Sequence, residues 1–238
     1  MKPTSSFRFK QFDVQHNSSS MKVGTDAVLL GAWAEAENVS RILDIGCGSG
    51  IIALMLAQRT EAQIVGVDID APSVEEAKTN AEKTAWKNRM RFYCTDIQRF
   101  CEEKNRKSFD LIVSNPPFFV NSLKSPVESK NRSRHTDTLT FSDLVKSVSH
   151  CLSENGSFAV ILPCIYGGQM ESLCRQNQLF CFRKLQILPK EGKSPNRILL
   201  QFKRTQTPPR SEVLTIRNAN NTYTDTYKEL TKDFYLNF

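Results

Sequence analysis

Residues 41–68, RILDIGCGSGIIALMLAQRTEAQIVGVD, decide the fold. A short apolar run at residues 41–45 leads into a cluster of three glycines: Gly46, Gly48 and Gly50. The apolar stretch at residues 51–58 is typical of a buried helix, and residues 63–68 form a second strand-like run. The order of strand, glycine loop, helix and strand is typical of the start of a parallel α/β sheet.

The same alternation continues along the chain. Further strands are expected at MRFYC, FDLIVS and SFAVIL, which are residues 90–94, 109–114 and 157–162. Helices are expected at residues 71–85 and at residues 140–152. This order predicts a doubly wound, mostly parallel sheet, in which a ligand binds beyond the carboxyl ends of the strands.

Two segments lie outside this alternation. Residues 7–33 precede the first strand of the sheet, and a helix is expected at residues 25–36 with Thr25 as its N-cap. Residues 121–137 are polar, rich in serine and basic, and they are long for a loop in a compact domain.

Length and composition narrow the class of protein. The chain has 238 residues, of which 39% are hydrophobic, so we expect one main domain with additions. No apolar run approaches the ~20 residues of a membrane span, and the N-terminus has no apolar signal region. The seven cysteines are irregularly spaced without a C-x-x-C pair, which argues against a disulfide framework or a zinc site. We therefore expect a cytoplasmic protein.

The net charge of +7 is unevenly placed. Residues 1–119 hold 15 Lys and Arg against 15 Asp and Glu, whereas residues 120–238 hold 17 against 10. The whole excess lies in the second half, which favours an anionic partner there, nucleic acid first. Ordinary solvated surface is the alternative explanation.

The glycine loop is not a dinucleotide fingerprint. That fingerprint, G-x-G-x-x-G, fails because Ile51 stands where its third glycine belongs. The spacing here is D-x-G-x-G-x-G from Asp44, and Asp68 ends the next strand, where a carboxylate can accept hydrogen bonds from a ribose diol.

LDIGCGSG followed by GVDID resembles the first two motifs of class I S-adenosylmethionine-dependent methyltransferases. The resemblance implies a Rossmann-like, seven-stranded sheet and S-adenosylmethionine as cofactor. It also implies cofactor contacts from six positions: Asp44, Gly46, Gly48, Gly50, Asp68 and Asp96. The last two would hold the ribose and the adenine amine. Support of the turn by Asp44 and an N-cap role for Asp96 remain alternatives.

The tetrapeptide Asn115-Pro116-Pro117-Phe118 follows the fourth strand. The prolines stiffen the backbone, so the Pro116 carbonyl and the Asn115 amide oxygen form two fixed acceptors for a planar NH2 group. Accepting both hydrogens localises the nitrogen lone pair, and no strong base is required because the proton becomes acidic only after methyl transfer. Phe118 or Phe119 can stack on an everted base. The tetrapeptide resembles the N-P-P-[FY] signature of methyltransferases that act on adenine N6, guanine N2 or glutamine amides.

The flanks extend the resemblance over nearly the whole chain. FRFKQFDV, MKVGTDAVLLGAW and LTKDFYLNF, at residues 7–14, 21–33 and 230–238, resemble bacterial tRNA adenine-N6 methyltransferases that act beside the anticodon of a valine tRNA. The resemblance implies that residues 1–36 cover the cofactor, with Lys22 and Thr25 as contacts, and that residues 37–238 form the methyltransferase domain.

The basic residues support a tRNA partner. We expect substrate contacts from six positions: Phe119, Lys124, Lys130, Arg132, Arg134 and Arg197. A second basic group, beside Phe180 and Phe182, adds four residues: Arg183, Lys184, Lys190 and Lys193. We expect no metal and a monomer.

Other functions stay open. The same chemistry could act on a release-factor glutamine or an rRNA guanine, although the basic second half argues against a protein substrate. A non-catalytic RNA-binding factor is the alternative from another class, and the intact Asp68 and Asn115 argue against it. A nicotinamide dehydrogenase fails at Ile51.

Overall fold

The computed structural model describes residues 6–15, 23–102, 106–117 and 139–237. The strands are β1 Ser6–Arg8, β2 Asp13–Gln15, β3 Arg41–Ile45, β4 Gln63–Asp68, β5 Met90–Cys94, β6 Phe109–Ser114, β7 Leu152–Pro163, β8 Phe180–Leu188, β9 Arg197–Lys203 and β10 Arg210–Thr215. The helices are α1 Thr25–Trp33, α2 Ile51–Arg59, α3 Ala71–Glu82, α4 Ile97–Glu102, α5 Phe141–Cys151, α6 Gly167–Gln176 and α7 Asp225–Thr231, with short 3-10 turns at Lys87–Arg89 and Cys164–Tyr166. No helix in the described ranges is long and apolar enough to cross a membrane.

The main sheet has the strand order β10-β8-β9-β7-β6-β3-β4-β5. Only the pairings of β9 with β7 and β8 are antiparallel. The doubly wound, mostly parallel architecture is therefore confirmed, but the expected count of seven strands is wrong, because β10 pairs with β8 as an eighth strand. Strand β10 lies at the edge of the sheet, leaves Val213 exposed and has no continuous apolar run. Strands β8 and β9 were not among the strands expected from the sequence either.

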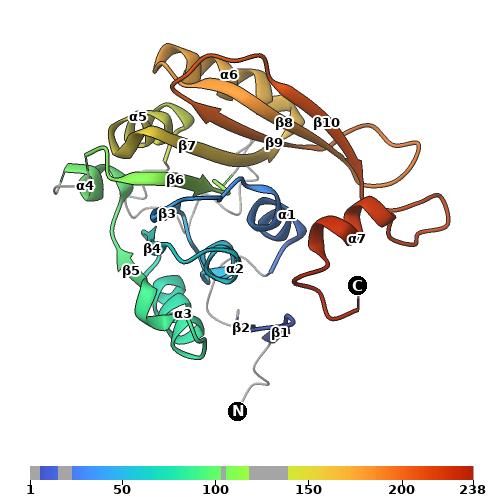
Figure 1. Ribbon diagram of the computed structural model, residues 1–238, viewed down its shortest axis with the longest axis horizontal. Helices are drawn as coiled ribbons and strands as arrows, with labels where there is room; N and C mark the ends of the chain where they lie inside the picture. Colours follow the sequence, from blue (N-terminus) through green and yellow to red (C-terminus); the bar gives the residue numbers. More distant parts are fainter. Residues whose placement is uncertain (1–5, 16–22, 103–105, 118–138, 238) are drawn as a thin grey trace, which may run out of the picture.

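The sheet is covered on both faces (Figure 1). Helices α1, α2, α3 and α7 pack on one face, and α4, α5 and α6 pack on the other, which produces two separate apolar cores. The strands of the sheet interior have no polar face for this reason, as expected for a parallel sheet between two helical layers.

Most local predictions are confirmed. Strands β3, β4, β5 and β6 have the expected bounds, and residues 157–162 lie within the longer β7. Thr140 caps α5, because its hydroxyl accepts a hydrogen bond from the Asp143 N–H at 3.1 Å. The N-cap prediction for Thr25 is wrong: Gly24 is the N-cap of α1, with no side-chain cap.

Helix α1 also ends earlier than expected, at Trp33. The carboxamide of Gln201 on β9 accepts from the Glu35 N–H at 3.1 Å and donates to the Glu35 carbonyl at 3.3 Å. In a continued helix the Glu35 N–H would donate to the Gly31 carbonyl. That carbonyl instead accepts a hydrogen bond from the Arg59 guanidinium at 2.7 Å. Tertiary hydrogen bonds therefore end the helix.

The N-terminal strands form a separate hairpin. Strands β1 and β2 pair with each other rather than with the main sheet. Phe9 and Phe12 are buried in the core on the α1–α3 face, and the Lys10 N–H donates to the Phe234 carbonyl at 2.8 Å. Both ends of the described chain thus pack on the same face of the sheet (Figure 1).

One cysteine pair departs from the expectation. Cys101 on α4 and Cys151 at the end of α5 are joined by a disulfide, with their Cα atoms 6.1 Å apart. The other cysteines are free, so the chain has no disulfide framework.

Gly66, in the middle of β4, provides a test of the packing. A Cβ atom there would lie 2.5 Å from Cδ1 of Phe92 and 3.0 Å from Cβ of Cys47. We predict that Gly66→Ala lowers the free energy of unfolding by about 1–3 kcal/mol, measured by urea denaturation. Gly168→Ala is the matched control, because nothing lies within 4 Å of its Cβ position. The control should be neutral or slightly stabilising, and equal losses in the two variants would contradict the proposed packing.

Candidate active site

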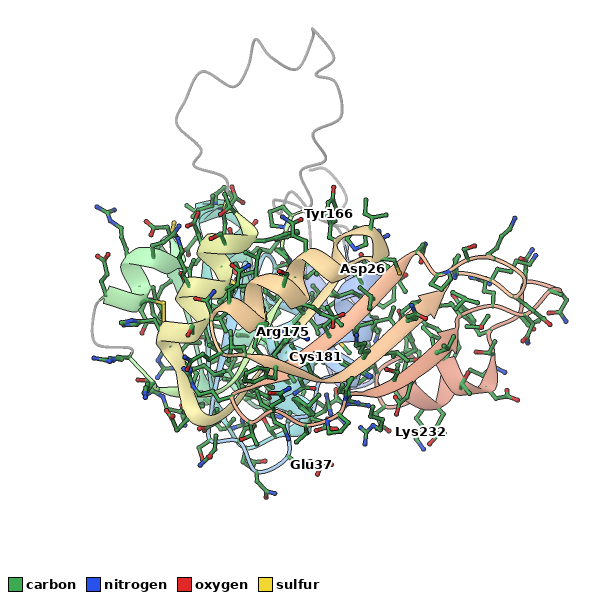
Figure 2. The ribbon with its side chains drawn as sticks, turned by 90° about the horizontal axis from the view of Figure 1, so that it is seen from above. Asp26, Glu37, Tyr166, Arg175, Cys181 and Lys232 are labelled. Atoms are coloured by element: carbon green, nitrogen blue, oxygen red, sulfur yellow. A yellow bond between two sulfur atoms is a disulfide. The ribbon has the colours of Figure 1, made fainter. Side chains whose placement is uncertain are left out.

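Three strand ends meet at the centre of the sheet. Ile45, at the end of β3, pairs with Val67 on one side and with Ser114 on the other. The Ser114 hydroxyl donates to the Ile45 carbonyl at 2.9 Å, which ties β6 to β3. The residues that follow these strands therefore lie together at the carboxyl edge. Figure 2 shows Tyr166 and Asp26 toward this edge and Glu37, which precedes β3, toward the opposite one.

The glycine loop turns sharply away from β3. The N–H groups of Gly46 and Cys47 both donate to the Val67 carbonyl, at 2.9 and 3.1 Å. All three glycines of the loop have positive φ, which a side chain would disfavour: Gly46, Gly48 and Gly50. Gly50 also packs closely on α3, since a Cβ there would lie 3.1 Å from the Cβ of Ala77. The loop thus leaves its backbone open to a ligand at the start of α2.

The Asp68 carboxylate is held by two backbone amides. Its Oδ2 accepts from the Gly48 N–H at 2.9 Å, and its Oδ1 accepts from the Asp70 N–H at 3.0 Å. The side chain is half-buried, and a carboxylate has further lone-pair positions beyond these two bonds. The arrangement can therefore accept hydrogen bonds from a diol while its position stays fixed by the loop.

Asp44 on β3 is fully buried, and neither carboxylate oxygen has a hydrogen-bond partner in the described structure. Burial raises the pKa of Asp44 to about 7; the nearby Ala53 amide lowers this pKa, and the Asp68 charge raises it. Such an unpaired acid is uncommon in a protein interior. It would be satisfied by a ligand group that carries a positive charge or donates hydrogen bonds.

Asn115 has a similar unused atom. The residue is 8% exposed, and its Oδ1 is buried without a partner among the residues that the structure describes. Asn115 directly follows β6, and Pro116 after it is also buried. A buried, unpaired acceptor at the carboxyl edge is suited to a ligand N–H.

Other predicted positions have structural partners. Asp96 is the N-cap of α4, because its Oδ1 accepts from the Arg99 N–H at 2.8 Å. Arg197 on β9 donates from Nε to the Asp26 carboxylate at 2.8 Å, which ties β9 to the first turn of α1. Thr25 is exposed at the start of α1. Seven predicted residues lie outside the described ranges: Lys22, Phe118, Phe119, Lys124, Lys130, Arg132 and Arg134.

The four residues of the second basic group lie in two different environments. Arg183 is mostly buried, stacks on the Trp33 ring at 4.4 Å and donates to the Trp33 carbonyl at 2.8 Å. Lys184 pairs with Glu171 at 2.8 Å. Both side chains therefore hold secondary structure together in the described structure. Lys190 and Lys193 differ, since they lie beyond β8 at the carboxyl edge.

Sequence reasoning missed Asn80 and Ser114. Both are fully buried polar residues that hydrogen-bond the backbone beside the glycine loop. Asn80 could have been found from the helical spacing of α3. It lies three residues after Ala77 and six after Val74, so it falls on the buried face of the helix although its side chain is polar.

A family model described as a methyltransferase domain matches residues 37–210. A Bacteroides fragilis protein named tRNA1(Val) (adenine(37)-N6)-methyltransferase is 40% identical over 230 residues, which cover 97% of each chain. A Haemophilus influenzae protein of the same name is 42% identical over 236 residues, which cover 98% of this chain and all of the other. The chain belongs to the tRNA1(Val) (adenine(37)-N6)-methyltransferase family.

Solved structures agree with this family's fold. A predicted O-methyltransferase from Agrobacterium tumefaciens has a TM-score of 0.72 at 18% identity and covers 88% of this chain and 96% of its own. A T. thermophilus 16S rRNA methyltransferase, solved with AdoMet and guanosine, has a TM-score of 0.58 at 23% identity, over 85% of this chain and 50% of its own.

As a member of this family, the protein is an S-adenosylmethionine-dependent methyltransferase. The described residues fit that cofactor. S-adenosylmethionine carries a ribose diol and a positively charged amino group and sulfonium, while the site offers the fixed Asp68 carboxylate and the unpaired Asp44 carboxylate. No group of three potential metal ligands occurs in the described ranges.

Asp44 makes the stability of the cofactor-free enzyme depend on pH. The folded protein keeps the Asp44 proton up to about pH 7, whereas an unfolded chain releases it at about pH 4. The free energy of unfolding should therefore fall as pH rises through this window. We predict that Asp44→Asn, which cannot titrate, gains about 1–4 kcal/mol relative to the wild type between pH 4 and pH 8. Urea denaturation without cofactor measures this difference, and parallel curves for the two proteins would refute it.

Proposed function

We propose that this enzyme transfers the methyl group of S-adenosylmethionine to N6 of adenosine 37 in a valine tRNA. The observation that carries the proposal is the buried, unpaired Oδ1 of Asn115, at the strand end beside the glycine loop. Relatives that carry this activity in their names are 40–42% identical over almost the full chain.

The cofactor would be held by the glycine loop and the acids around it. Asp68 would accept the ribose hydroxyls, and Asp44 would face the positively charged part of the cofactor. Asp96 would receive the adenine amine at Oδ2, because Oδ1 already caps α4. Lys22 and Thr25, from the N-terminal segment of residues 1–36, would add contacts. When bound, S-adenosylmethionine supplies an electrophilic methyl group.

Asn115 and Pro116 would activate the amine. The Asn115 Oδ1 and the Pro116 carbonyl accept the two N6 hydrogens, which localises the nitrogen lone pair toward the methyl group. Pro117 stiffens the turn, and Phe118 stacks on the everted adenine, with Phe119 beside it. Proximity and orientation of the two reactants would supply much of the remaining rate enhancement. The proton on N6 leaves after transfer, so a weakly basic site is sufficient.

The substrate would approach along the carboxyl edge. The loop at residues 189–196 connects β8 with β9 at this edge, and its Glu191 N–H donates to the Arg217 carbonyl at 2.8 Å. Exposed Lys193 and half-buried Lys190 on this loop are placed to contact tRNA phosphates. Arg197 would act by holding α1 through Asp26. Lys124, Lys130, Arg132 and Arg134 would add contacts from the segment after the tetrapeptide.

The alternative substrates are less well supported. A release-factor glutamine or an rRNA guanine would use the same two acceptors, but the names of the full-length relatives favour tRNA adenine. A non-catalytic RNA-binding factor would have no use for an unpaired Asn115 and Asp44 at adjacent strand ends.

We further propose that the enzyme acts as a cytoplasmic monomer without a metal. Its N-terminal residues 1–36 would cover the methyltransferase domain of residues 37–238.

Asn115→Ala tests the mechanism. The variant should lower kcat by about 100-fold or more, since it removes one of two acceptors that act on the reacting amine. Its affinity for S-adenosylmethionine, measured by calorimetry, should stay within twofold of the wild type. Undiminished turnover would remove Asn115 from the mechanism, and an equal loss of cofactor affinity would show that it acts by holding the cofactor.

Lys190→Gln with Lys193→Gln tests the substrate surface. Removing two phosphate contacts should weaken tRNA binding and reduce the slope of log affinity against log salt by about 1.5–2. Arg106→Gln with Lys107→Gln is a charge-matched control, because these residues precede β6 at the opposite edge of the sheet. Filter binding across a salt series measures both variants. Equal slopes in the two double variants would place the tRNA elsewhere.

A further inference from the structure

One side chain connects the glycine loop to the N-terminal hairpin. Asn80 on α3 is fully buried, and its carboxamide makes three hydrogen bonds. Nδ2 donates to the Ser49 carbonyl at 2.9 Å and to the Gln15 carbonyl at 3.0 Å, and Oδ1 accepts from the Gln15 N–H at 2.9 Å. Asn80 thus contacts two segments that are far apart in the sequence.

The bond to Ser49 fixes a peptide group of the loop. The Ser49 carbonyl and the Gly50 N–H belong to the same peptide unit, and that N–H donates to the Cys47 carbonyl at 2.8 Å. Asn80 therefore holds one side of this planar unit while Cys47 holds the other. No side chain caps α2 at Gly50, so this bond is a main restraint on the loop from the α3 side.

The bonds to Gln15 attach the hairpin. Gln15 is the last residue of β2, and both of its backbone polar groups pair with Asn80. The adjacent Val14 is fully buried in the core of this face. If the hairpin detaches, two of the three carboxamide bonds are lost, and the buried side chain is left to rotate or to bind water. The loop then loses its fixed partner at Ser49.

We propose that Asn80 is a positioning residue that couples the hairpin of residues 6–15 to the glycine loop and thereby strengthens S-adenosylmethionine binding. The proposal deepens the cofactor half of the proposed function and does not depend on which RNA is methylated. Coupling is reciprocal, so cofactor binding must also stabilise the hairpin.

Gln201 offers a matched control within the same chain. Its carboxamide is fully buried and also makes three hydrogen bonds, two with the backbone of Glu35 and one with the Ser157 hydroxyl at 2.9 Å. Gln201 thus attaches the end of the N-terminal segment as Asn80 attaches Gln15. It lies on β9 and bonds no residue of the glycine loop.

The experiment compares Asn80→Ala with Gln201→Ala. Both variants should lower the thermal midpoint, because each leaves backbone groups unpaired. Only Asn80→Ala should weaken S-adenosylmethionine binding, by about tenfold or more in calorimetry, while Gln201→Ala stays within twofold. Equal losses of affinity, or unchanged affinity in Asn80→Ala, would overturn the proposal. Failure of the wild type to bind S-adenosylmethionine would instead contradict the proposed function.

Two further measurements test the coupling between the hairpin and the glycine loop if Asn80→Ala does not fold. Gln15→Pro removes one donor to Asn80 and leaves the Ser49 bond, so we expect an affinity loss of about two- to fivefold. In the wild type, adding S-adenosylmethionine should slow amide hydrogen exchange in residues 6–15, measured by mass spectrometry of peptides. Unchanged exchange there, with slowed exchange in residues 46–50, would show that the loop binds cofactor without coupling to the hairpin.

Discussion

The parallel pairing of β3 with β4 on one side and β6 on the other is the constraint on which the site depends. It brings the ends of three strands to one edge, although their sequences are separated by helices. The strand order reverses direction at β3, and in open α/β sheets such a switch point leaves a crevice beyond the strand ends. The glycine loop, Asp68 and Asn115 lie at these three ends, so the sheet topology brings the proposed cofactor site and the proposed amine site together.

Buried polar side chains around this edge fall into two groups. Asn80 and Gln201 are fully buried, and each makes three hydrogen bonds, two of which attach the N-terminal segment to the sheet domain. Asp44 and Asn115 are also buried, yet they hold oxygens without a partner in the described ranges. An unpaired buried oxygen costs stability, and the ligands that we propose would provide partners for the second group, whereas the first group has structural partners.

The sequence allowed the central sheet to be predicted because its strands are continuous apolar runs between two helical layers. Strand β10 could not be found in this way, since an edge strand with Val213 exposed has no such run. The end of α1 depended on Gln201, which is 166 positions away from Glu35, and no local pattern reports a bond of that kind. Tertiary contacts rather than local propensity decided these cases.

In the candidate site, too, local motifs were predictable from the sequence, whereas tertiary pairing was not. Asp68 and the glycines were predictable because a motif places them at a strand end, whereas Arg183 and Lys184 looked like substrate contacts because sequence shows charge and not pairing. In the structure their charges are directed at Glu35, Glu212 and Glu171. Not every basic residue of the second half is therefore available to a nucleic acid.

Methylation of an unmodified valine tRNA transcript tests the central claim most directly. The purified enzyme is incubated with the transcript and S-adenosylmethionine labelled in its methyl group, and the digested nucleosides are identified by mass spectrometry. We predict labelled N6-methyladenosine at position 37, and no label in a transcript with guanosine at that position. Label in another nucleoside, or transfer only to a release-factor glutamine or to rRNA, would contradict the account.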